Sequence, residues 1–210
     1  MSHSPLLSVK QLSCQRGGVR LFHNLAFELA SGELLQLAGP NGVGKSSLLK
    51  ILAGLSTQYE GKMYWRGQKL ARRHSVYEKD LLFIGHLSGI KKSLSPLENL
   101  RWYFPETEDS KILDALQHVG LAHYEDQPCA GLSAGQQRRV VLARLYLSSA
   151  VLWVLDEPFT AIDQKGVRQV EQRILEHIAK GGAALITTHH DLGISARKLD
   201  LSDFAVGALT

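Results

Sequence analysis

Residues 39 to 46, Gly39-Pro-Asn-Gly-Val-Gly-Lys-Ser46, match the phosphate-binding pattern G-x-x-x-x-G-K-[ST] at every fixed position. An apolar run, Leu34-Leu-Gln-Leu-Ala38, precedes the stretch, and a helical run, Ser47-Leu-Leu-Lys-Ile-Leu-Ala53, follows it and ends at Gly54. A strand, a glycine-rich loop and a helix in this order are the setting that the pattern requires. A glycine-rich turn that only joins strand to helix is the alternative, but it leaves the final lysine and serine unexplained. The stretch therefore predicts a nucleoside triphosphate site.

The chemistry of this loop follows from its glycines. Without a Cβ, their backbone takes positive φ angles and approaches a ligand closely. The freed N–H groups form an anion-binding nest at a helix N-terminus. The Lys45 ammonium is expected to contact the β- and γ-phosphates of ATP, and the Ser46 hydroxyl is expected to bind Mg²⁺. The residues predicted to bind the nucleotide here are Gly39, Pro40, Asn41, Gly42, Val43, Gly44, Lys45, Ser46 and Ser47.

Length and composition limit the class of protein. The chain has 210 residues, enough for one large domain or two small lobes. Its longest apolar run, Ala150–Leu155, is too short to span a bilayer. The N-terminus lacks the features of a signal peptide and the two cysteines are isolated, so we expect a cytosolic chain with reduced thiols. The net charge of +4 is mild, and the basic clusters at 69–74 and 91–92 are typical of solvated surface. No nucleic-acid partner is expected.

Strands that alternate with helices predict an α/β fold with a mostly parallel sheet. Short strands are expected at 7–12 and 25–29 in a small antiparallel sheet, with another hairpin around 62–66. Buried strands are expected at 34–38, 81–84, 151–155 and 183–188, and helices at 47–53, 96–103, 110–119 and 163–178. We predict one domain, 1–210, whose core comprises 6–86 and 151–210, with a helical subdomain inserted at 87–150.

Two carboxylates end one of the buried strands. Val151-Leu-Trp-Val-Leu155 is apolar at every position and is followed by Asp156 and Glu157. A strand that is apolar on both faces lies in the middle of a parallel sheet, so its C-terminal end opens at the ligand crevice. Asp156 is therefore predicted to hold Mg²⁺ opposite Ser46, and Glu157 to act as a general base on the attacking water. A pair of carboxylates that caps the strand and faces solvent is the alternative.

A third motif, Leu132-Ser-Ala-Gly-Gln-Gln137, begins another helix. Ser133 and Gln136 fit a capping box, which is a sufficient local explanation. A capped helix N-terminus with Ser and Gly is also an anion site. One nucleotide has one γ-phosphate, which Lys45 is already predicted to contact. The economical interpretation is that the second site serves the nucleotide of another subunit.

The order of these motifs resembles that of the ATP-binding-cassette (ABC) ATPases, over about residues 6 to 192. Leu132–Gln136 resembles the LSGGQ signature, Thr160-Ala-Ile-Asp163 resembles the D-loop, and His189 resembles the switch histidine. The resemblance implies a P-loop NTPase fold. Specifically, it implies an ABC-type nucleotide-binding domain with a mostly parallel core sheet, an N-terminal antiparallel β subdomain and an inserted helical subdomain.

The resemblance also implies a mechanism. Two copies of the chain form a head-to-tail dimer, and each ATP lies between one copy's phosphate loop and the other copy's signature helix. Glu157 activates water, and His189, or the neighbouring His190, contacts the γ-phosphate. The residues that the resemblance adds to the nucleotide site are Ser133, Gly135, Gln136 and Asp163.

Two positions depart from the pattern of the family. Where ABC ATPases have an aromatic residue that stacks on adenine, this chain has Arg16, whose guanidinium plane can also stack on a purine. Where they have a glutamine that contacts Mg²⁺ and the transport partner, this chain has His86. A neutral imidazole can bind a metal or hydrogen-bond to a water, and its behaviour depends on pH.

Four stretches resemble, more narrowly, the haem-exporter ATPases of cytochrome c maturation in Gram-negative bacteria, the CcmA family. They are Phe83-Ile-Gly-His-Leu-Ser-Gly-Ile-Lys91, Pro96-Leu-Glu-Asn-Leu100, Leu132-Ser-Ala-Gly-Gln-Gln-Arg-Arg139 and Leu155-Asp-Glu-Pro-Phe-Thr-Ala-Ile-Asp163. This resemblance implies an ATPase on the cytoplasmic face of the inner membrane, bound to integral membrane subunits like CcmB and CcmC and linked to the haem chaperone CcmE. The alternatives are the ATPase of another exporter or of a lipoprotein-release complex, a DNA-repair or translation ATPase, and a nucleotide-gated clamp without hydrolysis.

Overall fold

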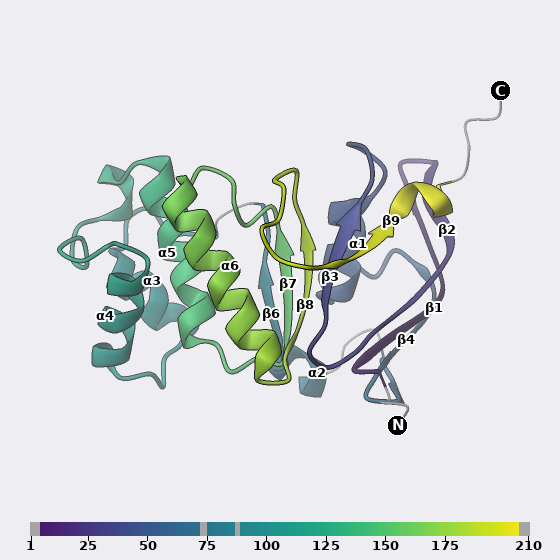
Figure 1. The fold of residues 1–210 in the computed structure, drawn as a ribbon, viewed down its shortest axis with the longest axis horizontal. Coiled ribbons are helices and arrows are strands. Elements are labelled where there is room, and N and C mark those ends of the chain that lie inside the picture. Colours follow the sequence, from purple (N-terminus) through teal and green to yellow (C-terminus); the bar gives the residue numbers. More distant parts are fainter. Residues whose placement is uncertain (1–4, 72–74, 87–88, 206–210) are drawn as a thin grey trace.

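A computed structural model describes residues 5–71, 75–86 and 89–205, which form an α/β structure built on two sheets (Figure 1). The parallel sheet has the order β6 (Leu81–Ile84), β7 (Leu152–Asp156), β8 (Ala183–Thr187), β3 (Leu34–Ala38) and β9 (Arg197–Asp200). The antiparallel sheet has the order β2 (Val19–Leu29), β1 (Leu7–Arg16), β4 (Glu60–Trp65) and β5 (Gln68–Lys69). The predicted fold class, with a mostly parallel core sheet and an antiparallel second sheet, is confirmed.

Helices lie on both sides of the parallel sheet. The helices are α1 (Lys45–Leu52), α2 (Ser75–Lys79), α3 (Pro96–Tyr103), α4 (Asp109–His118), α5 (Ala134–Leu147) and α6 (Gln164–Ala179), with 3₁₀ turns η1 (Cys129–Gly131) and η2 (Leu201–Phe204). In Figure 1, α3, α4 and α5 lie at the opposite end of the molecule from the antiparallel sheet, and α6 crosses one face of the parallel sheet. Helices α3 and α5 begin directly after Ser95 and Ser133, as predicted, because both serines form complete capping boxes. Helix α2 is not predicted, and α1 begins two residues earlier than expected.

Strand β7 lies between two apolar clusters. Its residues Trp153 and Leu155 belong to a cluster with α4, α5 and α6, whereas Leu152 and Val154 belong to a cluster with α1 and the antiparallel sheet. Every residue of β7 is buried, as expected for a strand that is apolar on both faces. Because parallel strands end at the same edge of a sheet, the residues that follow β3, β6, β7 and β8 lie near one another.

The edge strand β9 is the main element that the sequence does not predict. Its residues, Arg-Lys-Leu-Asp, are mostly exposed, and it pairs only with β3. Charged residues are common on edge strands, where one side of the backbone has no partner strand. Such a segment has no apolar alternation, so it resembles a loop. Strands β1 and β2 are longer than predicted and meet at a turn formed by Gly17 and Gly18, whose φ angles are 57° and 80°.

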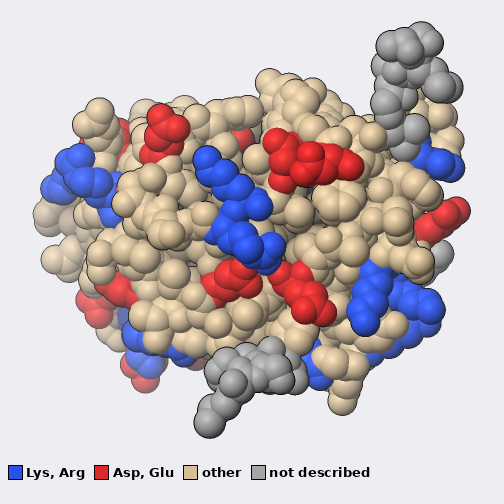
Figure 2. Space-filling model, turned by 45° about the vertical axis from the view of Figure 1, so that its right-hand side comes forward, with Lys and Arg blue, Asp and Glu red and all other residues tan. Residues whose placement is uncertain are grey.

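Charged side chains of both signs are interspersed on the surface shown in Figure 2, with wide uncharged areas between them. Of the two predicted basic clusters, Lys69, Lys91 and Lys92 are exposed, whereas Arg72, Arg73 and His74 lie outside the described residues. Within the described ranges, none of the helices combines the length and the apolar character needed to cross a membrane.

His177 is a titratable group inside the core. Its ring stacks on Trp153 with a centroid distance of 3.8 Å and an interplanar angle of 4°. Its Nε2 lies 3.1 Å from the Val151 carbonyl and 3.3 Å from the Ala183 carbonyl, so the neutral ring donates there. Burial lowers the pKa of His177 below its ordinary value, and the two carbonyls oppose that shift. The neutral imidazole is therefore the form that the fold requires.

We predict that the free energy of unfolding decreases below neutral pH because of His177. The folded-state pKa lies below the unfolded value of about 6.5, so the contribution is complete above that pH and is lost as pH falls through the folded pKa. For one unit below 6.5 the loss is at most about 1.4 kcal/mol. Urea titrations at pH 7.5 and 5.5 should show a smaller decrease for His177→Gln, which retains an N–H donor, than for the wild type. Equal decreases would contradict this prediction.

Candidate nucleotide-binding site

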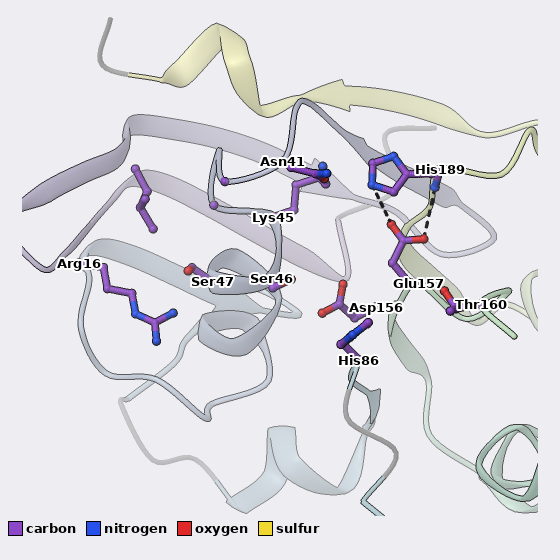
Figure 3. A pocket seen from close by; sticks show the side chains of 13 residues that line it. Arg16, Asn41, Lys45, Ser46, Ser47, His86, Asp156, Glu157, Thr160 and His189 are labelled. Carbon is purple, nitrogen blue, oxygen red and sulfur yellow. Dashed lines mark hydrogen bonds and ion pairs between the residues drawn. The ribbon is translucent and has the colours of Figure 1, made fainter. Parts of the chain in front are cut away.

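A cavity of about 580 Å³ lies where the phosphate loop, the ends of β7 and β8 and the β1–β2 hairpin meet (Figure 3). It is open to solvent and brings together residues that are up to 173 positions apart in the chain, from Arg16 to His189. Its lining residues are Arg16, Leu21, Asn41, Gly42, Gly44, Lys45, Ser46, Ser47, His86, Asp156, Glu157, Thr160 and His189. Most of the residues predicted for a nucleotide site therefore share one cavity.

The Lys45 ammonium is held at the phosphate loop by the loop's own backbone. Its Nζ donates to the carbonyl of Gly39 and, at 3.1 Å, to the carbonyl of Pro40. Gly39 and Pro40 do not line the cavity, so their part in the site is to orient the lysine. Val43 likewise lies outside the cavity lining and packs against an apolar cluster. The ammonium thus stands beside the loop's N–H groups, where it can meet a phosphate.

Gly44 precedes the first residue of α1 and has a φ of 109°. A Cβ at this position would lie 3.1 Å from both the Leu21 Cβ and the Phe22 ring. Close packing and a left-handed backbone together require glycine here. The N-terminus of α1 consequently opens on the cavity without a side chain in front of it.

Asp156 is buried at the end of β7, with 4% of its surface exposed. Its Oδ1 accepts a hydrogen bond from the Thr187 hydroxyl at 2.7 Å. The same hydroxyl accepts the Glu157 N–H at 3.1 Å, and that N–H also donates to the Thr187 carbonyl. Thr187 of β8 thus orients the Asp156 carboxylate and holds the backbone of Glu157 at the end of β7. The Asp156 carboxylate and the Ser46 hydroxyl line the same cavity, and oxygen ligands of this kind fit Mg²⁺.

Glu157 has a left-handed backbone, with a φ of 49°. For a residue other than glycine this conformation costs about 1–3 kcal/mol and persists only where surrounding contacts hold it. The Glu157 Oε1 lies 3.5 Å from His189 Nε2, and Oε2 accepts the His189 N–H at 3.3 Å (Figure 3). His190 does not line the cavity; its ring lies 5.5 Å from that of Phe159. Of the two histidines, His189 is the one at the site.

The remaining lining residues lie around this centre. Arg16 is separated from Glu157 and His189 by the phosphate loop and α1, whereas His86 lies beside Asp156 (Figure 3). Arg16 and His86 are both exposed, so they can reach a ligand in the cavity. Thr160 and Leu21 also line the cavity without having been predicted. Thr160 could have been found from its place in the D-loop-like stretch.

The signature residues lie outside the cavity. Ser133 and Gln136 exchange the hydrogen bonds of a capping box at the start of α5, with lengths of 2.9 and 3.2 Å. Asp163 caps α6 by accepting the Gly166 N–H at 2.9 Å, which lowers its pKa, and it pairs with Arg139 at 2.7 Å. These residues are therefore not part of the same copy's cavity. A role at the nucleotide of a second copy, also for Gly135, stays a prediction.

Comparisons with known proteins agree with this geometry. The family model of ABC transporters matches residues 22–160. The cytochrome c biogenesis ATP-binding export protein CcmA of Hahella chejuensis is 50% identical over 195 residues, which cover 91% of this chain and 92% of that protein.

Two solved structures share the fold. A putative ABC transporter ATP-binding protein from Pyrococcus furiosus has a TM-score of 0.80 and 24% identity, and the match covers 95% of this chain and 99% of that one. An ATP-binding cassette in a dimeric post-hydrolysis state, bound to ADP and Pi, has a TM-score of 0.77 and 23% identity over 88% of each chain. At these identities the likeness supports the fold alone.

We predict that Thr187→Val lowers the free energy of unfolding by about 1–3 kcal/mol, because it leaves a buried carboxylate without its hydrogen-bond donor. Thr187→Ser retains the hydroxyl and should be close to the wild type, apart from the loss of one methyl group. Chemical unfolding at pH 7.5 measures both variants. If valine and serine have the same effect, the hydroxyl network does not support Asp156.

The ordered motifs, the cavity that joins them and the 50% identical relative all indicate one protein family. The chain belongs to the ABC transporter family and, within it, to the cytochrome c biogenesis ATP-binding export proteins, the CcmA family.

Proposed function

We propose that this chain is the ATP-hydrolysing subunit of an inner-membrane ABC complex for cytochrome c maturation, peripheral to the membrane on its cytoplasmic face. The observation that carries the ATPase assignment is the convergence of Lys45, Ser46, Asp156, Glu157 and His189 on one cavity. The assignment to cytochrome c maturation is supported by the names of relatives that are about half identical to it over nearly its whole length.

The phosphate loop binds the triphosphate of ATP. Backbone N–H groups at the start of α1 and the Lys45 ammonium face the anion, and the helix dipole adds to their attraction. Lys45 exchanges its bonds to the loop carbonyls for bonds to the β- and γ-phosphates. Ser46 and Asp156 would hold Mg²⁺, with His86 beside them. Bound there, Mg²⁺ would supply positive charge that stabilises the charge developing on the phosphates.

Glu157 acts as the general base. Its carboxylate faces the cavity and is fixed by two contacts to His189, so it can orient and polarise a water in line with the γ-phosphate. General-base catalysis of this kind contributes about 10²- to 10⁴-fold to the rate. His189 contacts the γ-phosphate and, through its two contacts with the Glu157 carboxylate, links the position of that carboxylate to the bound phosphate.

The second half of each ATP site comes from another copy of the chain. Ser133, Gly135 and Gln136 lie at the capped N-terminus of α5, outside their own cavity, where they are free to meet an anion across a dimer interface. Asp163 lies beside them through its ion pair with Arg139. ATP closes two copies together, and release of products reopens them.

This motion is passed to integral membrane subunits like CcmB and CcmC. The complex uses the ATP cycle to export haem or to release the haem chaperone CcmE. Arg16 stacks on the adenine base in place of an aromatic residue, since it lines the cavity on the other side of the phosphate loop from Glu157 (Figure 3).

We predict that Glu157→Gln abolishes c-type cytochromes while the variant is still made and still bound to the membrane. The substitution removes the general base but retains the size and polarity of the side chain. A covalent-haem stain of membrane and periplasmic proteins measures the outcome in cells that carry only the variant. Glu176→Gln, an exposed position on α6, is the matched control and should leave the bands unchanged. Normal bands in Glu157→Gln would rule out the role in cytochrome c maturation.

We predict that Arg16→Ala raises the KM for ATP about five- to tenfold with little change in kcat, because cation–π stacking on the base contributes about 1 kcal/mol to binding. Arg16→Tyr should restore the wild-type KM. Arg20→Ala tests a basic residue of the same hairpin that does not line the cavity, and it should have no effect. An unchanged KM in Arg16→Ala would show that the arginine does not contact the base.

A further inference from the structure

Arg138 is a buried arginine in α5, five residues after Ser133. Only 7% of its surface is exposed, and no carboxylate among the described residues lies within ion-pair distance of it. Its guanidinium donates to four backbone carbonyls instead. They are those of Pro158 at 3.4 Å, Gly85 at 3.3 Å, Asp156 at 3.3 Å and Glu157 at 2.7 Å. Burial lowers the pKa of Arg138, and the charges of Asp156 and Glu157 oppose that shift.

These carbonyls belong to two strand ends. Gly85 follows β6 and precedes His86, whereas Asp156 to Pro158 end β7 and begin the next turn. The Arg138 guanidinium therefore connects the backbone that follows β6 to the backbone at the end of β7. A buried cation is costly unless every N–H finds an acceptor, and here the acceptors are the peptide groups that carry the site residues.

The Glu157 carbonyl receives the shortest of these bonds. On its other side, the Glu157 N–H is held by the hydroxyl and the carbonyl of Thr187. The two peptide groups of Glu157 are therefore both hydrogen-bonded, one to Arg138 of α5 and the other to Thr187 of β8. A left-handed backbone at a residue other than glycine persists only where several contacts hold it, and these hydrogen bonds are such contacts.

We propose that Arg138 is a positioning residue for ATP hydrolysis, which holds the Glu157 carboxylate in the cavity by fixing the Glu157 backbone. The inference rests on the proposed function, because it takes Glu157 as the general base.

The variant that isolates this role is Arg138→Lys. It retains the positive charge, but a single ammonium cannot reach carbonyls on both strand ends as a planar fork does. In the full chain within its membrane complex, kcat should fall at least tenfold while the KM for ATP stays within about twofold. In the Glu157→Gln background the same substitution should cause no further loss of residual turnover, because its effect acts through Glu157.

Arg173→Lys is the matched control. Arg173, in α6, also donates to a backbone carbonyl, that of Leu145 at 3.0 Å. Leu145 is near the C-terminal end of α5, so this contact lies away from the cavity. Its kcat should stay within twofold of the wild type. A wild-type kcat for Arg138→Lys, or equal losses in the two arginine variants, would overturn the proposal.

Hydrogen exchange gives a second readout that does not need turnover. In the full-length chain, Arg138→Lys should speed exchange of the Glu157, Phe159 and Thr160 amides at least tenfold and leave α1 unchanged. If the wild type does not hydrolyse ATP, the proposed function is wrong, yet exchange at these amides still decides the positioning role. Unchanged exchange, or faster exchange throughout the chain, would show that Arg138 does not hold this turn specifically.

Discussion

The backbone of Glu157 is the constraint on which the rest of the site depends. To turn a carboxylate into the cavity directly after a buried strand, this residue adopts a left-handed conformation. Its cost of about 1–3 kcal/mol is offset by hydrogen bonds from Thr187 and Arg138, of which those involving charged groups contribute about 1.5–3 kcal/mol each. Since these partners come from β8 and α5, the conformation at the end of β7 depends on both neighbouring elements.

The contacts of Asp156 and Glu157 with Thr187 form only in the observed register of β7 and β8. Asp156 pairs with Thr187 across β7 and β8, and that pairing places the Thr187 hydroxyl between the Asp156 carboxylate and the Glu157 N–H. A slip of one residue would turn every side chain of β7 to the opposite face. The slip is prevented by the core, because Trp153 packs into the cluster beside α6 and Val154 into the cluster beside α1. Apolar packing in the middle of β7 thereby positions the polar residues at its end.

The sequence predicts the parts of the site whose geometry is local. The phosphate loop and the capping box at Ser133 each depend on residues within a few positions, so spacing alone identifies them. Thr187 and Arg138 act on residues 31 and 19 positions away, and neither stands out in its own segment. The same limit applies to β9, an edge strand that is recognisable only from its pairing with β3.

The two departures from the family pattern lie where the site can accommodate them. Arg16 and His86 are exposed on the cavity wall, and no hydrogen bond of the Glu157 network involves either. Contacts to the base contribute binding that is equal in the ground state and the transition state, so a change there alters affinity more than the rate of the chemical step. The groups proposed to face the phosphates are held by the protein itself, because Lys45 donates to loop carbonyls and the end of β7 is bonded to Thr187. Substitutions at the exposed Arg16 and His86 are therefore expected to alter the site less than substitutions that disturb the left-handed peptide at Glu157.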